Sequence, residues 1–124
     1  MDVLRNMVEA VKPGGLVLDL QVIRPNPVVE AEQRDLCEID GTPLFRTADA
    51  AAAAVDDLIS LRRLVEQAVD DHDVRAHYES GVALVDDFAG KRRQIPAEAL
   101  PELRTLERRC SLHERCRLRR LQVR

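Results

Sequence analysis

The chain has 124 residues, of which 45% are hydrophobic, 33% charged and 2% aromatic. This length suits a single domain, and the composition is typical of a folded protein and not of a disordered one. Trp is absent, so the sequence offers no row of aromatic rings on which nucleobases could stack. Neither a signal-peptide pattern nor an apolar run of the roughly 20 residues that a membrane span needs is present, and we therefore expect a cytoplasmic protein.

The formal net charge of −3 hides an asymmetry along the chain. Residues 1–90 hold 8 Lys and Arg against 18 Asp and Glu, whereas residues 91–124 hold 11 against 4. A basic end can contact phosphates, or it can neutralise the acidic part of its own fold. We favour the second interpretation and do not expect a nucleic-acid partner. The first remains open as an alternative function, a small nucleic-acid- or protein-binding module that uses the basic segment 91–124.

The first elements have clear local signals. Apolar residues at helical spacing predict a helix over 2–12, which Pro13-Gly14-Gly15 ends. The run 16–23 predicts a strand that is apolar on both faces, as is typical of strands covered by helices on both sides of a sheet. Arg24-Pro25-Asn26-Pro27 is expected to terminate this strand.

The middle of the chain predicts a hairpin and a long helix. Two short β-like pieces are expected at 28–32 and 36–46, the second folded back on itself at Asp40-Gly41. Thr47 or Asp49 would then cap a helix that runs to about residue 70. The remaining predicted elements are a strand over 73–79, a helix capped by Ser80, a helix opened by Pro96 or Pro101 and carrying Cys110, and an Arg-rich strand over 112–123 whose apolar residues change phase through a bulge.

Cysteine and histidine give no clear site. Cys110, His113 and Cys116 could suggest zinc, but their spacing fits neither a knuckle nor a finger, and we predict no metal site. His77 could act as a general base. On a strand it would point away from Tyr78, so we expect His77 at the surface and Tyr78 in the core.

The order of elements indicates an α/β fold, and several segments resemble a known family. MVEAVKPGGLVLDLQVI, residues 7–23, resembles the segment of class I S-adenosylmethionine-dependent methyltransferases that runs from the fourth helix through Pro-Gly-Gly into the fifth strand. AAAAVDDLI, residues 51–59, is similar to the fifth helix. DVRAHYES, residues 73–80, is similar to the sixth strand. RCRLRRLQV, residues 115–123, resembles the seventh strand, which in that family inserts antiparallel between the fifth and sixth.

This resemblance implies a partial Rossmann-like methyltransferase sheet with flanking helices. Residues 1–124 would form one C-terminal half domain that lacks the cofactor-binding half. The family holds its cofactor with a glycine-rich turn after strand one and an acidic residue after strand two. None of the five glycines here forms a Gly-x-Gly turn between a strand and a helix. We therefore assign no catalytic and no cofactor-binding residue.

The resulting expectation is a methyltransferase-like protein that is truncated and inactive alone. It would use S-adenosylmethionine only if a partner supplied the binding half. Substrate would approach the carboxyl end of the 16–23 strand, where Gln21 and Arg24 are the nearest polar groups and either could orient a carboxylate or a hydroxyl. Half of a parallel sheet would expose the edge of that strand, so we expect a homo-oligomer or a complementary chain.

Overall fold

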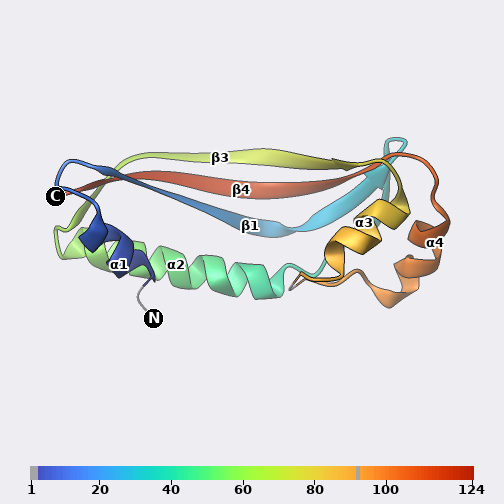
Figure 1. Ribbon diagram of the computed structural model, residues 1–124, viewed down its shortest axis with the longest axis horizontal. Coiled ribbons are helices and arrows are strands. Elements are labelled where there is room, and N and C mark those ends of the chain that lie inside the picture. Colours follow the sequence, from blue (N-terminus) through green and yellow to red (C-terminus); the bar gives the residue numbers. More distant parts are fainter. Residues whose placement is uncertain (1–2, 92) are drawn as a thin grey trace.

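The structure is a computed structural model that describes residues 3–91 and 93–124. Four strands form one sheet in the order β2-β1-β4-β3, and every neighbouring pair is antiparallel (Figure 1). β1 and β3 therefore run in the same direction on either side of β4. The elements, in chain order, are α1 (Val3–Ala10), β1 (Leu16–Ala31), β2 (Arg34–Glu38), α2 (Thr42–Ser60), β3 (Leu64–Tyr78), α3 (Gly81–Phe88), the short 3₁₀ helix η1 (Ala97–Ala99), α4 (Leu100–Thr105) and β4 (Cys110–Val123).

The α/β class is confirmed, but the sheet differs from the expected one. A Rossmann-like sheet is built mainly from parallel neighbours, and no such pair occurs in the described part of this chain. α1 and its stop are found as predicted. Gly14 has a φ of 86°, and the Gly15 N–H donates to the Lys12 carbonyl at 2.8 Å. No helix among the described residues is long and apolar enough to cross a membrane.

The first strand is longer than the sequence indicates. Residues 24–27 do not end β1, because its pairing with β4 shifts register between Ile23 and Val28 and then continues to Glu30. The proline-containing segment thus lies where the pairing of β1 with β4 is interrupted. Proline has no backbone N–H, so its presence there removes no hydrogen bond between the strands.

The predicted hairpin at Asp40-Gly41 is wrong. The hairpin turn is formed by Glu32 and Gln33, with φ values of 53° and 65°, and it joins β1 to β2. Asp40 instead precedes α2, and its Oδ1 accepts hydrogen bonds from the Thr42 N–H at 3.0 Å and from the Thr42 hydroxyl at 2.6 Å. An Asp-Gly pair serves a helix start as readily as a hairpin, so this local signal was ambiguous.

The helix expected from Thr47 or Asp49 to about residue 70 is also displaced. α2 begins at Thr42 and ends at Ser60, and a turn that contains Arg62 at φ 59° leads into β3 at Leu64. Val65 and Ala68, which fall within the helix predicted to about residue 70, therefore lie on a strand. Pairing with β4 along the whole of β3 decides this outcome over the helical spacing.

The C-terminal half is closer to the prediction. Ser80 caps α3, because its Oγ accepts from the Ala83 N–H at 3.2 Å. Pro101 lies in the first turn of α4. Cys110, predicted on the last helix, begins β4 instead. The final strand is confirmed, and it is the central partner of both β1 and β3.

Two hydrophobic clusters lie on opposite faces of the sheet. Val17 and Leu121 pack with residues of α1 and α2, whereas Val29 and Leu112 pack with residues of α3 and α4. Leu112 and Leu121 are nine residues apart on β4, so they point to opposite faces. We call the face that carries Leu121 the α2 face and the face that carries Leu112 the α3 face. The strands twist across one another between the two ends, and helices from both ends lie below the sheet in Figure 1.

This arrangement explains the change of phase in the last strand. The buried residues of β4 are Cys110, Leu112 and Cys116 near its start, and Leu121 and Val123 near its end. No bulge in β4 is needed, because helices cover the α3 face at one end and the α2 face at the other. The register shifts lie in its neighbours, between Ile23 and Val28 in β1 and between Glu66 and Ala68 in β3.

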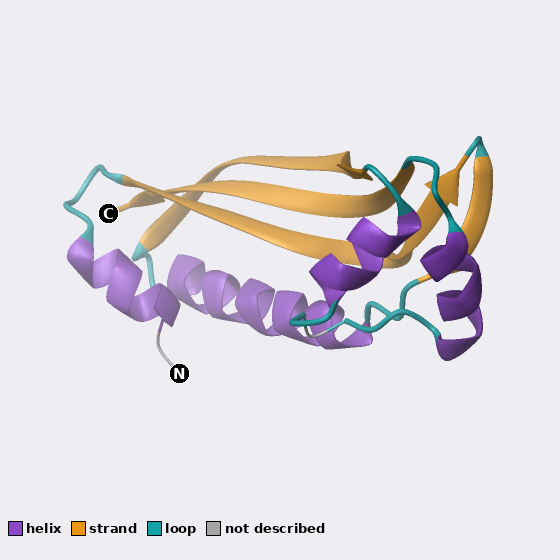
Figure 2. Cartoon of the chain, turned by 45° about the vertical axis from the view of Figure 1, so that its right-hand side comes forward, coloured by secondary structure: helices purple, strands orange, loops and turns teal. Residues whose placement is uncertain are grey.

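Each face therefore has a part that its own helices do not bury. Figure 2 shows helices beside both ends of the long strands. On the α3 face, Leu16, Leu18 and Leu20 of β1 are 44%, 61% and 58% exposed. The expectation that the 16–23 strand is covered on both faces is therefore wrong for the chain alone.

Candidate functional site

Three arginines of β4 form a row on the α2 face, as the alternation of the last strand predicts. Arg115, Arg117 and Arg119 each contact acidic side chains of the same chain. Arg117 makes two hydrogen bonds to Asp71, from Nε to Oδ1 at 2.8 Å and from Nη2 to Oδ2 at 2.9 Å. Arg115 Nη1 donates to Asp73 Oδ1 at 3.0 Å.

Arg119 connects two elements. Its Nε donates to Glu66 Oε2 on β3 at 2.7 Å, and its Nη2 donates to Asp56 Oδ1 on α2 at 3.1 Å. The basic end thus meets acidic residues of its own fold, as we expected. Most of these acids lie on the strand β3 and not on a helix. Hydrogen bonds from Arg117 and Arg115 hold the pKa values of the Asp71 and Asp73 carboxyls below the usual range.

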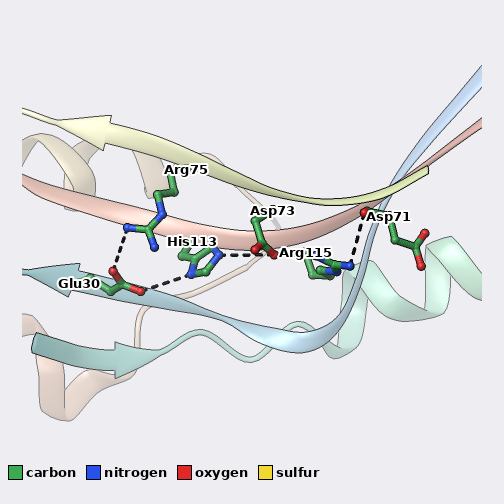
Figure 3. A network of polar contacts seen from close by, with 6 residues as sticks. All are labelled: Glu30, Asp71, Asp73, Arg75, His113 and Arg115. Carbon is green, nitrogen blue, oxygen red and sulfur yellow. Dashed lines mark hydrogen bonds and ion pairs between the residues drawn. The ribbon is translucent and has the colours of Figure 1, made fainter. Parts of the chain in front are cut away.

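The row continues into a network around His113 (Figure 3). Its Nδ1 lies 3.3 Å from Glu30 Oε1 of β1, and its Nε2 lies 3.6 Å from Asp73 Oδ1 of β3. Arg75 Nη1 approaches the other oxygen of Glu30, Oε2, at 3.3 Å. Figure 3 shows these side chains spanning three strands. Because both ring nitrogens of His113 face carboxylates, neither is aimed at open space, and the network is better suited to joining strands than to proton transfer with a substrate.

The cysteines do not join His113 in a metal site. Cys110 and Cys116 lie on the α3 face, opposite His113, and both are buried. Burial raises the pKa of each thiol, which disfavours the thiolate that zinc requires. In the part of the chain that the structure describes, no three His, Cys, Asp or Glu side chains are grouped to hold a metal ion.

The other aromatic and histidine residues of the region are also dispersed. His77 is exposed and Tyr78 packs against the cluster of α3 and α4, as predicted. The Tyr78 hydroxyl donates to Asp87 Oδ2 at 2.6 Å. Burial, with the contact to Asp87, raises the pKa of Tyr78 to about 12, so its hydroxyl stays protonated at neutral pH. His72 Nδ1 lies 3.0 Å from Asp70 Oδ2, with a geometry that makes no hydrogen bond.

The two candidate substrate residues are separated by the structure. Gln21 Nε2 donates to Asp19 Oδ1 at 2.9 Å on the α2 face. Arg24 lies at the irregular part of β1, with its guanidinium 5.0 Å from the centre of the Phe45 ring and its Nη2 3.3 Å from Asp49 Oδ2. Gln21 and Arg24 therefore have different partners and do not converge on one group.

Arg24 is the better placed of the two. It lines an open pocket of about 440 Å³ together with Pro25, Asn26, Thr42 and Phe45. Asn26 Oδ1 accepts the Gly41 N–H at 3.0 Å, which fixes the irregular part of β1 to the start of α2. A guanidinium above an aromatic ring can bind a carboxylate. The pocket lining contains no His, Cys, Asp or Glu, and its one hydroxyl, that of Thr42, donates to Asp40 Oδ1 at 2.6 Å.

Sequence reasoning missed most of the network residues. Glu30 and Arg75 were not singled out, and the helix predicted to about residue 70 hid the strand that carries Glu66. The usable signal was the alternate placement of Asp71 and Asp73, which pair in register with Arg117 and Arg115 and so indicate paired strands.

The described residues do not fit S-adenosylmethionine. Gly14, the one described glycine with a positive φ, precedes a strand and not a helix. At the start of α2, a Cβ on Gly41 would lie 2.4 Å from Cζ of Phe45, so this glycine makes room for a side chain of its own fold. Comparison with models of known protein families, with curated proteins and with solved structures finds no match for this chain.

Proposed function

We propose that this chain is the C-terminal half of a methyltransferase-like α/β domain of the S-adenosylmethionine-dependent class. It is inactive by itself and acts only where a partner supplies the cofactor half. The observation that carries this proposal is the arrangement of three strands. β4, the last strand of the chain, lies antiparallel between β1 and β3, which run in the same direction. The resemblance implies this arrangement for the seventh strand between the fifth and sixth.

The helices add support. α1 precedes β1, α2 connects the β1–β2 hairpin to β3, and both pack against the α2 face of the sheet. The hairpin strand β2 and the segment that contains α3 and α4 are additions for which the resemblance gives no counterpart. They lie at the end of the sheet toward which β1 and β3 run, where a substrate would approach.

Within this proposal Arg24 is the residue that orients the substrate. Its pocket lies beside the irregularity that interrupts β1, and its guanidinium can pair with a carboxylate or donate to a hydroxyl. Gln21 has no such role, because it is bonded to Asp19 away from the pocket.

Calorimetric titration of the isolated chain with S-adenosylmethionine tests the first part of the proposal. We expect no saturable binding, since no described glycine turn could receive the cofactor. A dissociation constant on the order of 1 μM for the isolated chain, about −8 kcal/mol, would contradict it.

The second part needs the partner. The genomic sequence directly upstream, in frame or neighbouring, is the first place to look for a segment with a Gly-x-Gly turn between a strand and a helix. The two polypeptides purified together should bind the cofactor. Arg24→Ala should lower methyl transfer by the complex while leaving cofactor binding unchanged. A complex that does not bind the cofactor would refute the proposal.

A further inference from the structure

An apolar stripe lies bare on the first half of β1. Leu16, Leu18 and Leu20 alternate along the strand, so their side chains share the α3 face, and all three are among the exposed large hydrophobic residues. Their register partners on β4 are Gln122, Arg120 and Leu118. Two of these three β4 partners are polar, so the apolar surface does not continue onto β4. A covering element would therefore lie over β1 itself.

The same stretch of β1 has an unpaired edge. β2 pairs only with residues 28–31 of β1, so residues 16–23 bond β4 on one side and no described strand on the other. Asp19 is the one charged residue in this stretch. An unpaired edge with so little charge readily accepts another strand.

The opposite edge of the sheet is different. β3 is the end strand on that side, and it carries Glu66, Asp70, Asp71, Asp73 and Arg75. Charged side chains along an edge are a common means by which proteins prevent further strand pairing. The chain thus protects one edge and leaves the other open.

The two uncovered half-faces differ in the same way. The uncovered part of the α2 face carries the network of Glu30, His113 and Asp73, which is suited to water. The uncovered part of the α3 face carries the leucine stripe. A monomer that needed no partner would be expected to carry polar side chains on both of these uncovered surfaces.

A second copy of this chain fits the surface poorly. Joined edge to edge at β1, two copies would leave both leucine stripes bare, because the neighbouring strand would carry the same uncovered face. Packed face to face, they would cover the leucines and leave both edges unpaired. A strand that is followed or preceded by a helix packed on the α3 face satisfies both features at once.

We propose that residues 16–23 of β1 are the docking surface for a different polypeptide, which adds a strand to this edge and packs an apolar helix over Leu16, Leu18 and Leu20. The covering helix carries an acidic residue beside its apolar face, opposite Arg120, for which no ion pair is found among the described residues. This inference rests on the proposed function in one respect, because the polypeptide that docks here is taken to be the one that supplies the cofactor half.

Site-specific crosslinking tests the surface in the cells that make the protein. Leu18 is replaced by the photoreactive residue benzoylphenylalanine in the full chain, and the crosslinked peptide is sequenced by mass spectrometry. Leu61 is the matched control, since it is 64% exposed against 61% for Leu18 and lies in the turn after α2. We expect a product from position 18 and not from position 61. The peptide captured should belong to a strand of alternating apolar residues next to an amphipathic helix.

The captured polypeptide is then purified, and its affinity for three variants of this chain is measured. Each variant must first show the same urea-unfolding midpoint as the unchanged protein, so that a change in affinity does not reflect a loss of folding. Leu18→Lys and Leu20→Lys should each weaken binding by about tenfold or more, because they place a charge in the centre of the contact. Leu61→Lys should change it by less than about twofold. Equal crosslinking from positions 18 and 61, no product, crosslinks to this chain alone, or unchanged binding of both leucine variants would each overturn the inference.

The outcome separates this inference from the proposed function. If the partner docks through Leu18 and Leu20 but the complex does not bind S-adenosylmethionine, the docking surface stands and the methyltransferase proposal fails. If the complex binds the cofactor and both lysine variants bind the partner normally, the function stands and the surface is wrong.

Discussion

The ion pair between Arg93 and Glu114 gives the sharpest test of how the C-terminal helices are held. Arg93 lies in the segment after α3, and its Nη1 contacts Glu114 Oε1 on the central strand β4. Both side chains are only 12% exposed. The Arg93 guanidinium also lies 5.4 Å from the centre of the Phe88 ring. The pair therefore joins the segment that leads to α4 to the middle of the sheet.

Replacing Arg93 and replacing Glu114 should lower the free energy of unfolding by different amounts. Arg93→Met leaves a carboxylate fixed on a central strand in a mostly buried position, and we expect a loss of about 3 kcal/mol, at the lower end of the range for buried pairs. Glu114→Leu leaves a long side chain on an irregular segment, which can turn toward water and keep its contact with Phe88. That change should cost about 1–2 kcal/mol. The double variant replaces both charges with apolar groups and should cost about 1 kcal/mol or less.

Urea unfolding followed by circular dichroism at pH 7 measures these values. With a slope of about 2 kcal/mol per molar urea, Arg93→Met should lower the midpoint by about 1.5 M with no change in slope. The double variant should be more stable than Arg93→Met alone, giving a coupling energy of about 3 kcal/mol. Equal losses for the two single variants, or losses that simply add in the double variant, would refute the reasoning.

Two further predictions concern the arginine row. The pKa values of Asp71 and Asp73 are lowered in the fold by hydrogen bonds from Arg117 and Arg115, so their stabilising contribution is present above the ordinary value of 3.8 and is lost as the pH falls through the lowered values. The free energy of unfolding should therefore decline less between about pH 5 and pH 2.5 in Asp71→Asn than in the unchanged protein, and parallel declines would contradict this. Because the same arginines are already paired, RNA and DNA should bind no better than about 10⁻⁴ to 10⁻⁶ M at physiological salt, as measured by fluorescence anisotropy. Tight, saturable binding that is lost when Arg115, Arg117 and Arg119 become Glu would instead support the nucleic-acid-binding alternative.

The parts of the fold that sequence reasoning predicted have strong local signals. Pro13-Gly14-Gly15 stops α1 through backbone geometry that only a few residues favour. Ser80 supplies a cap whose oxygen bonds the third residue after it. The final strand is marked by arginines that alternate with apolar or small side chains. In each case the determining interaction lies within a few residues along the chain.

The missed parts depend on partners far away in sequence. The strand predicted over 73–79 is found as the second half of β3, but the first half of β3, residues 64–72, was missed, and there only Leu64 is buried. It is a strand because β4, beginning more than thirty residues after β3 ends, offers a row of arginines in register with its acids. The His113 network has the same origin. Glu30, Asp73 and His113 come together only once three strands have paired in the correct register, which no local pattern specifies.

Two observations, one from the sequence and one from the packing, support the proposal that a second polypeptide joins this sheet. The lack of a glycine-rich turn is a property of the sequence, whereas the exposure of Leu18 and the free edge of β1 are properties of the packing. The chain covers Val17, the next residue along the same strand, with α1 and α2. Helices thus cover β1 on the α2 face. On the α3 face, Leu16, Leu18 and Leu20 offer apolar side chains that a helix could cover in the same way. A strand that is apolar on both faces favours burial on both, so residues 16–23 favour a second polypeptide as the missing cover.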